Sequence, residues 1–250
     1  MFHDFRARLL RKERLIGTMV TLAAPELAEL LSSVGFDWLF LDAEHGALAA
    51  RDLQALVQAA GATTPCVVRV EAAAEVPIKK ALDIGAAGVI VPQVNSAAQA
   101  REVVRFAKYS PQGARGVGVT RAHGYGLRLR EYLRDANDQV AVIVQAEHID
   151  AVDRIEEIVR VPGVDAVMVG PYDLSASLGR MGEVDHPEVL AAIDRVTKAC
   201  RDAGVPLGYF GVSAAAIQPY AARDYTLLVA GTDTLLLGQA AQGILGQLRG

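Results

Sequence analysis

The stretch Val164–Gly179 reads VDAVMVGPYDLSASLG, and its pattern is the one from which the fold is predicted. Its first six residues form a branched apolar run with the length of a buried β-strand. A glycine and a proline end the run, and Asp173 stands just beyond it. Ser175 and Ser177 are placed to cap a following helix, and an isolated aspartate there is most often an N-cap itself. In parallel α/β folds the same place binds ligands, so Asp173 is also a candidate functional carboxylate.

Similar apolar runs recur along the chain and mostly alternate with helical segments. The predicted strands cover residues 16–22, 36–42, 66–70, 88–92, 140–147, 164–169, 206–210 and 226–231. The predicted helices cover residues 6–14, 25–33, 51–60, 77–82, 97–107, 151–159 and 187–203, and an apolar helix follows Thr234. No linker or change of composition divides the chain. The pattern therefore predicts one α/β domain, a (β/α)8 TIM barrel over residues 1–250.

Composition narrows the class of protein. Hydrophobic residues make up 52% and charged residues 22% of the 250, which is ample for a core. No apolar run approaches the ~20 residues of a membrane span, and the first residues lack the apolar block of a signal peptide. A net charge of −4 without a basic cluster argues against nucleic acid as a partner. Cys66 and Cys200 lack metal-ligand spacing and are typical of reduced packing residues in a cytoplasmic protein.

One segment, residues 110–126, is rich in glycine and has little periodicity. Its Gly113–Gly118 portion is superficially like a nucleotide-binding loop, but it follows a helix and lacks the Lys-Ser/Thr ending. A loop of this length in a compact domain is expected to be a functional lid or a subunit contact.

Polar residues collect at the C-terminal ends of the predicted strands, where active sites of such barrels lie. They are Glu44 and His45 after the strand at 36–42, Arg69 near the end of the strand at 66–70, Gln145 and Glu147 at the end of the strand at 140–147, and Asp173. Although these residues are far apart in the sequence, the barrel would direct them into one basin.

Each of these residue types suggests a chemistry. Glu147 and Asp173, from adjacent strands, suit a hard divalent cation such as Mg²⁺ or Mn²⁺, although two solvated acids on the barrel rim are the simpler alternative. Arg69 lies in an apolar strand and needs an anion, either a protein carboxylate or a substrate oxygen. His45 is a candidate acid/base because an imidazole titrates near physiological pH.

Four segments together resemble the signature of the HpcH/HpaI aldolase family. They are Asp42-Ala43-Glu44-His45-Gly46, Val68-Arg69, Gln145-Ala146-Glu147 and Gly170-Pro171-Tyr172-Asp173-Leu174-Ser175. The similarity runs from about Ile16 to the C-terminal helix, with the segments in matching order and spacing, which makes it specific. The resemblance implies a class II pyruvate aldolase that reversibly cleaves a 4-hydroxy-2-oxoacid to pyruvate and an aldehyde. A 2-keto-3-deoxy sugar acid or 4-hydroxy-2-oxoheptanedioate would be such a substrate.

The resemblance also implies roles for individual residues. Glu147 and Asp173 would bind a divalent metal ion (Mg²⁺, Mn²⁺ or Co²⁺), which pyruvate chelates. Gln145 and the backbone around Tyr172 and Asp173 would hold the pyruvate.

The same resemblance assigns the proton transfer and the charge stabilisation. His45 would be the acid/base, and Arg69 would stabilise the developing enolate. Asp83 matches the acid that orients the histidine of the family.

Departures from the family pattern affect the aldehyde rather than the pyruvate. Tyr172 stands where a smaller residue is common, His148 where threonine is frequent, and Met19 in place of a tryptophan. The expected pocket walls are Met19, Val119, Tyr125 and Phe210. A Schiff-base mechanism needs a lysine inside the barrel. The candidate lysines lie on predicted helices or at their ends, which disfavours this mechanism. They are Lys79, Lys80, Lys108 and Lys198.

Two alternatives remain at this stage. One is a lyase of the same superfamily acting on malyl- or citryl-CoA thioesters, and the other is a barrel that only binds a metabolite. The C-terminal helix is more apolar than a peripheral helix needs to be. The family resemblance implies that subunits exchange this helix and assemble as a homohexamer, a trimer of dimers.

Overall fold

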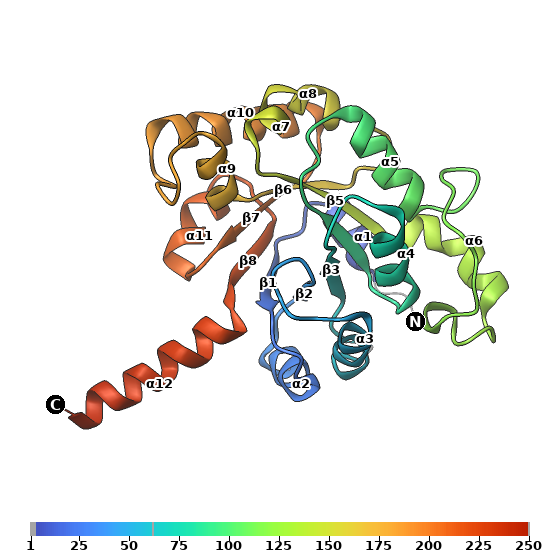
Figure 1. Cartoon of the computed structure of the whole chain (residues 1–250), viewed down its shortest axis with the longest axis horizontal. Helices are drawn as coiled ribbons and strands as arrows, with labels where there is room; N and C mark the ends of the chain where they lie inside the picture. Colours follow the sequence, from blue (N-terminus) through green and yellow to red (C-terminus); the bar gives the residue numbers. More distant parts are fainter. Residues whose placement is uncertain (1–3, 62, 250) are drawn as a thin grey trace.

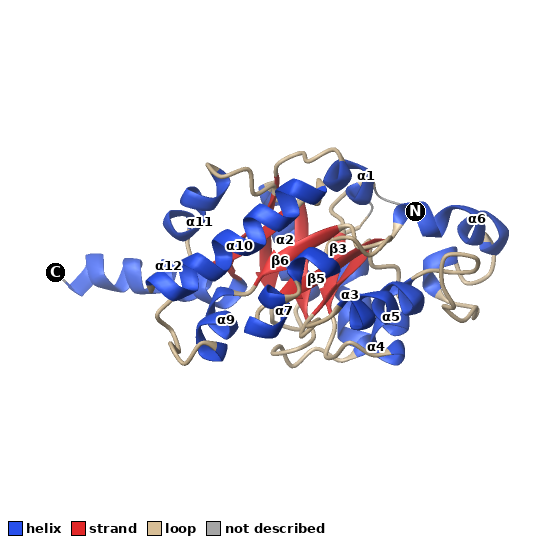
Figure 2. Cartoon of the chain, turned by 90° about the horizontal axis from the view of Figure 1, so that it is seen from above, coloured by secondary structure: helices blue, strands red, loops and turns tan. Residues whose placement is uncertain are grey.

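The fold is a closed barrel of eight parallel strands surrounded by helices, as the sequence predicts (Figures 1 and 2). A computed structural model describes residues 4–61 and 63–249. The strands follow the chain order around the barrel, and β8 pairs with β1 to close it. The strands are β1 (Leu15–Val20), β2 (Trp38–Asp42), β3 (Cys66–Arg69), β4 (Gly88–Val91), β5 (Ala141–Ala146), β6 (Ala166–Val169), β7 (Leu207–Gly211) and β8 (Leu227–Thr232).

The helices connect the strands and pack around the outside of the barrel. They are α1 (Phe5–Leu10), α2 (Pro25–Val34), α3 (Ala50–Ala59), α4 (Glu75–Asp83), α5 (Ala97–Ala107), η1 (Arg121–His123), α6 (Leu129–Gln139), α7 (Ile149–Asp153), α8 (Ile155–Ile158), α9 (Pro171–Ser177), α10 (Pro187–Ala203), α11 (Ala214–Ala221) and α12 (Asp233–Arg249). The sequence did not predict α6 or α11, and it predicted the helix after β6 to begin at the serines, later than α9 does. Helix α6 is strongly charged and buries only Tyr132 and Ala136.

The interior of the barrel is closed at one end by α1. Phe5 and Leu9 of this helix belong to the same cluster of buried residues as Leu15 and Trp38, the first residues of β1 and β2. The rings of Phe5 and Trp38 lie 5.7 Å apart. Helix α1 therefore covers the N-terminal ends of the strands, and the C-terminal ends remain free to form a pocket.

The segment at residues 110–126 lies at the N-terminal ends of the strands, because it follows α5 and precedes β5. Arg115 is buried there and its guanidinium Nη2 lies 2.6 Å from Oδ1 of Asp83, the last residue of α4. The expectation of a lid is wrong for the pocket of the same chain, since the segment and the functional strand ends are at opposite ends of the barrel. Whether it contacts another subunit stays a prediction.

Helix α12 extends away from the barrel (Figure 1). It is joined to the body by Asp233, whose carboxylate accepts the backbone N–H groups of Thr21 and Leu22 at 2.8 and 2.9 Å. Every residue of the helix from Thr234 to Arg249 is exposed. The exposed apolar side chains are Leu235, Leu236, Leu237, Ile244, Leu245 and Leu248. Among the described residues, no helix combines the length and the apolar character required to cross a membrane.

Candidate active site

A pocket of about 280 Å³ opens at the C-terminal ends of the strands. The residues of this pocket that the sequence singled out are His45, Arg69, Gln145, Tyr172 and Asp173, together with the expected wall residues Met19 and Phe210. Asp42, Phe40 and Gly170 also line it. The barrel thus brings together side chains from β2, β3 and β5 and from the start of α9, as predicted.

A buried ion pair joins two residues of the pocket, Asp42 and Arg69. The guanidinium donates from Nε to Oδ1 at 2.9 Å and from Nη2 to Oδ2 at 2.8 Å, a bidentate arrangement. Burial alone would lower the pKa of Arg69, but the hydrogen bonds and the charge of Asp42 outweigh it and raise that pKa. Asp42 Oδ1 also lies 3.1 Å from the backbone N–H of Glu44. The sequence allowed either a protein carboxylate or a substrate oxygen as the partner of Arg69, and in the structure the partner is the carboxylate of Asp42.

Glu44 lies between Arg69 and His45. Its Oε2 is 3.2 Å from Arg69 Nε and 3.8 Å from His45 Nε2. The Arg69 Nε–H points at Asp42 rather than at Glu44. The Glu44 Oε2 atom is buried and accepts no hydrogen bond within the described residues. Burial raises the pKa of Glu44, against the opposing charges of Arg69 and His45. The imidazole of His45 is 66% exposed at the rim, where a substrate can reach it.

Glu147 is the second buried carboxylate and directly follows β5. Its Oε1 accepts the backbone N–H of Gln93 at 2.7 Å, and its Oε2 accepts a hydrogen bond from the side-chain amide of Gln145. Burial raises the pKa of Glu147 to about 7, and the charges of Glu44 and Asp173 act in the same direction. The charge of Arg69 only partly offsets these effects, so a cation bound nearby would stabilise the ionised carboxylate.

Gln93 is a functional residue that the sequence reading missed. It follows β4 and has a φ of 55°, a left-handed conformation that is uncommon for a residue with a side chain. The conformation directs its N–H at Glu147. The only signal in the sequence was its place after Pro92 at the end of a strand, which carries no chemistry by itself.

Gly170 leaves the space that Gln145 and Glu147 occupy. A Cβ built at this glycine would lie 2.9 Å from Gln145 Nε2 and 3.0 Å from Glu147 Oε2. A side chain at this position would therefore displace the buried amide or the carboxylate. Gln145 Oε1 is buried beside them and has no hydrogen-bond partner among the described residues.

Asp173 belongs to the first turn of α9, which begins at Pro171. The sequence suggested that Ser175 and Ser177 cap this helix, but they do not. Ser175 Oγ donates to the carbonyl of Tyr172 at 2.6 Å, and Ser177 Oγ donates to the carbonyl of Leu174 at 2.8 Å. The proline starts the helix one turn earlier than the serines would, since its fixed φ suits the first helical position.

The donor set of Glu147 and Asp173 fits a divalent cation of the Mg²⁺ type. Both carboxylates influence one basin, because the charge of Asp173 raises the pKa of Glu147. Within the described residues there is no group of three or more His, Cys, Asp or Glu residues that could hold a metal. A cation bound here would complete its shell with water, substrate oxygens or the unpartnered Gln145 Oε1, as Mg²⁺ commonly does.

Asp83, Val119 and Tyr125 do not lie at this pocket of the same chain, and their roles at the pocket of another subunit stay predictions. Helix α4 runs back from the C-terminal to the N-terminal ends of the strands, so its last residue, Asp83, is at the far end of the barrel from His45. There it binds Arg115, and it cannot orient His45 of the same chain. Val119 and Tyr125 are exposed in the segment at the same far end.

A sequence model described as HpcH/HpaI aldolase/citrate lyase matches residues 15–240. A hydroxypyruvate/pyruvate aldolase from Cupriavidus necator is 39% identical over 99% of this chain and 93% of its own length. A 2-keto-3-deoxy-L-rhamnonate aldolase from Klebsiella pneumoniae is 38% identical over 95% of this chain and 90% of its own. A crystal structure of an HpcH/HpaI aldolase/citrate lyase family protein from Burkholderia cenocepacia superposes with a TM-score of 0.95, at 38% identity and 99% coverage of both chains.

The buried ion pair generates a prediction about stability. Asp42→Asn removes the charge that compensates the Arg69 guanidinium, and breaking such a pair typically costs about 3 kcal/mol of unfolding free energy or more. Urea denaturation of the variant and of the wild type measures this difference. Glu156→Gln, which breaks an exposed pair with Arg195, is the matched control and should change little. Equal stability of Asp42→Asn and wild type would show that the ion pair does not hold the site together.

Proposed function

Because the chain belongs to the HpcH/HpaI aldolase/citrate lyase family, we propose that it is a divalent-metal-dependent pyruvate aldolase. Relatives of 38–39% identity over nearly the whole chain are named as aldolases, and this chain is an aldolase, a carbon–carbon lyase. Its substrate class is a 4-hydroxy-2-oxoacid, such as a 2-keto-3-deoxy sugar acid, or an aldol product of hydroxypyruvate. One observation carries the metal dependence. Glu147 is buried within electrostatic range of Asp173 and of Arg69, the arginine that Asp42 fixes.

The metal site would consist of Glu147 and Asp173. A divalent cation there would act as a Lewis acid on the 1-carboxylate and 2-keto oxygens of the oxoacid. Gln145 and the backbone at Tyr172 and Asp173 would orient the same end of the substrate. Both ligands are carboxylates, so they do not by themselves select among Mg²⁺, Mn²⁺ and Co²⁺.

The residues of the chain would carry the proton and the charge. In cleavage, His45 takes the proton of the C4 hydroxyl, the C3–C4 bond breaks, and the aldehyde leaves. The electron pair of that bond forms the enolate of pyruvate, which then takes up a proton at its terminal carbon. Arg69 gives Nε and Nη2 to Asp42, while its Nη1 makes no hydrogen bond within the described residues. This nitrogen would donate to the oxygen on which charge develops.

Two other mechanisms are less well supported. The described residues that line the pocket include no lysine, and Lys108 is instead buried where it donates to the carbonyl oxygens of Asn137 and Val140. A Schiff base therefore lacks its amine. A lyase acting on CoA thioesters is disfavoured by the names of the relatives. Comparing turnover of free oxoacids with that of CoA esters distinguishes the two, and turnover of neither would favour a barrel that only binds a metabolite.

We extend the proposal to the assembly of the protein. The six apolar side chains of α12 are exposed, although the first residue of the helix is anchored by hydrogen bonds. Exchange of α12 between two subunits would bury this surface, and a trimer of such dimers would give the hexamer. The support is the apolar surface itself, since contiguous patches of this kind mark association sites.

The raised pKa of Glu147 predicts how metal affinity depends on pH. The carboxyl must lose its proton to bind a cation, so the apparent affinity for Mn²⁺ should fall about tenfold per pH unit below pH 7 and level off above it. Without metal, the stability of the fold changes with pH in the opposite direction. A group with a raised folded-state pKa stabilises the fold at low pH, and this contribution is lost as pH rises through about 7.

Calorimetric titration with Mn²⁺ across this range tests the prediction. Glu147→Gln should weaken binding and remove the pH dependence, whereas Asp173→Asn should weaken binding and keep it. The same pH dependence in wild type and Glu147→Gln would exclude Glu147 as the titrating ligand.

Two reactions separate the role of His45 from that of Arg69. Decarboxylation of oxaloacetate yields the same pyruvate enolate but requires no base, because CO₂ leaves from C4. His45→Ala should therefore reduce aldol cleavage by about 10²–10⁴ and decarboxylation much less. Arg69→Lys keeps the charge without the fork and should reduce both by about 10²–10³. Equal losses in folded His45→Ala would move this residue from proton transfer to substrate binding.

The proposed helix exchange predicts a change of oligomeric state. Ile244→Ser and Leu237→Ser place hydroxyls on exposed apolar positions of α12 and should shift the hexamer toward smaller species. Gln239→Ser, on the same helix, is the control and should leave the assembly unchanged. Light scattering after size-exclusion chromatography measures the mass. A wild-type monomer at micromolar concentration would contradict the proposal.

A further inference from the structure

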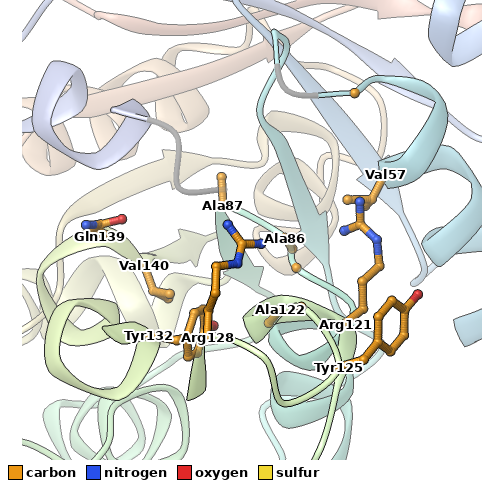
Figure 3. A pocket seen from close by; sticks show the side chains of 13 residues that line it. Val57, Ala86, Ala87, Arg121, Ala122, Tyr125, Arg128, Tyr132, Gln139 and Val140 are labelled. Atoms are coloured by element: carbon orange, nitrogen blue, oxygen red, sulfur yellow. The ribbon is translucent and has the colours of Figure 1, made fainter. Parts of the chain in front are cut away.

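A second cavity, of about 330 Å³, lies at the N-terminal ends of the strands (Figure 3). One wall is the turn Gly85–Ala87 that leads into β4, and another is Gln139 and Val140, which lead into β5. The remaining walls come from the end of α3 and from the segment that contains η1 and the start of α6. Its size is in the range of pockets that bind small molecules. It is distinct from the aldolase pocket, which is at the other end of the barrel.

The charge of this cavity is entirely positive. Arg121 and Arg128 are its charged residues, and no carboxylate belongs to the described lining. Arg121 is half-buried, and its Nη1 donates to the carbonyl of Ile84 at 2.7 Å. Neither arginine forms an ion pair within residues 4–61 and 63–249, in contrast to the nearby Arg115, which binds Asp83. In Figure 3 both side chains extend from the segment around Ala122 toward the space beside Ala86 and Val57.

The positions of the two arginines depend on glycines. Gly85 has a φ of 92°, and a Cβ there would lie 2.6 Å from Arg121 Nη1. Gly124 has a φ of 65°, and its Cβ would lie 3.2 Å from Arg128 Nε. Each guanidinium therefore rests on a backbone surface that only a glycine leaves open. The hydrogen bond to the Ile84 carbonyl also holds Arg121 in place, so this side chain has less freedom to lose on binding a ligand.

The other walls indicate what else the ligand carries. Val57, Ala86, Ala87 and Val140 provide apolar surface for a short carbon skeleton. Gln139 contributes a buried side-chain oxygen, Oε1, that accepts no hydrogen bond from the described residues. A buried acceptor without a donor is unfavourable, and a ligand hydroxyl would satisfy it. Two guanidinium groups demand an oxyanion, because their planar donors match the oxygens of a carboxylate or a phosphate.

We propose that this cavity binds a small hydroxylated oxyanion, with the carboxylate or phosphate between Arg121 and Arg128 and a hydroxyl donating to Gln139. The exposed Arg128 is at the solvent side and Arg121 is deeper. The inference does not rest on the proposed catalytic mechanism. It rests on two uncompensated guanidinium groups, on the glycines beneath them and on an unpartnered buried oxygen in one cavity.

Calorimetric titration with three related probes tests the proposal. Glycerol 3-phosphate and glycerate share a hydroxylated three-carbon skeleton and differ in the anion, and glycerol lacks the anion. We expect both anions to bind the full-length wild-type protein more weakly as salt increases, and glycerol not to bind. The tighter of the two anions identifies the phosphate or the carboxylate as the group that the cavity prefers.

Variants locate the binding. Arg128→Ala alters an exposed side chain far from the aldolase pocket and should weaken anion binding about tenfold to a hundredfold, as expected when one charged hydrogen-bond partner is lost. Arg121→Gln should weaken it similarly. Arg130→Ala, an exposed arginine of α6 outside the cavity, is the matched control and should bind as wild type does. Binding that is equal in wild type and Arg128→Ala, or absent at millimolar anion, would overturn the proposal.

Discussion

The site depends on a buried ion pair that follows directly from strand register. Asp42 and Arg69 are the last residues of β2 and β3, and they are register partners in the parallel ladder. Their side chains therefore emerge side by side, where the carboxylate can meet the guanidinium in a bidentate contact. Since a buried guanidinium without a partner is costly, the pair ties the position of the arginine to the closure of the barrel. An arginine fixed in this way needs no reorganisation when charge develops near it.

The groups around Glu147, next to Gln145 of the pocket, are arranged less favourably. Glu147 is buried with its charge only partly offset, Gln93 adopts a left-handed backbone conformation to reach it, and Gln145 has a buried oxygen without a partner. These three unfavourable features occur together at the C-terminal ends of the strands. Such concentration is typical of functional sites, where the surrounding structure maintains local strain. A cation or a substrate bound there would relieve it.

The sequence predicted the barrel because short branched runs and helical segments alternate along the whole chain, and the positions of the strand ends then placed His45, Arg69, Gln145 and Asp173 around one pocket. Three kinds of detail were not accessible. The partner of Arg69 depends on register rather than on spacing. The distance of Asp83 from His45 depends on the direction in which α4 runs.

The third kind is the role of groups without a distinctive side chain. The contribution of Gln93 comes from its backbone N–H, and that of Gly170 comes from an atom it lacks. Helices α6 and α11 were missed for a related reason. They bury few side chains, two in each case, so each has few apolar positions from which a helix could be predicted.

In the aldolase pocket, the residues that form the walls are separate from the hydrogen-bonded charged groups. This separation affects how such an enzyme can acquire new substrates. Met19 and Phe210 line the pocket without taking part in the hydrogen bonds that hold Arg69 and Glu147. Exchanges at these wall positions alter the shape offered to the aldehyde and leave the charged groups where they are. Gly170 is the counterpart, a position where the smallest addition disturbs the carboxylate. Substrate range and chemical step can therefore drift independently in evolution, and a mutant library aimed at new aldehydes has its natural targets in the walls.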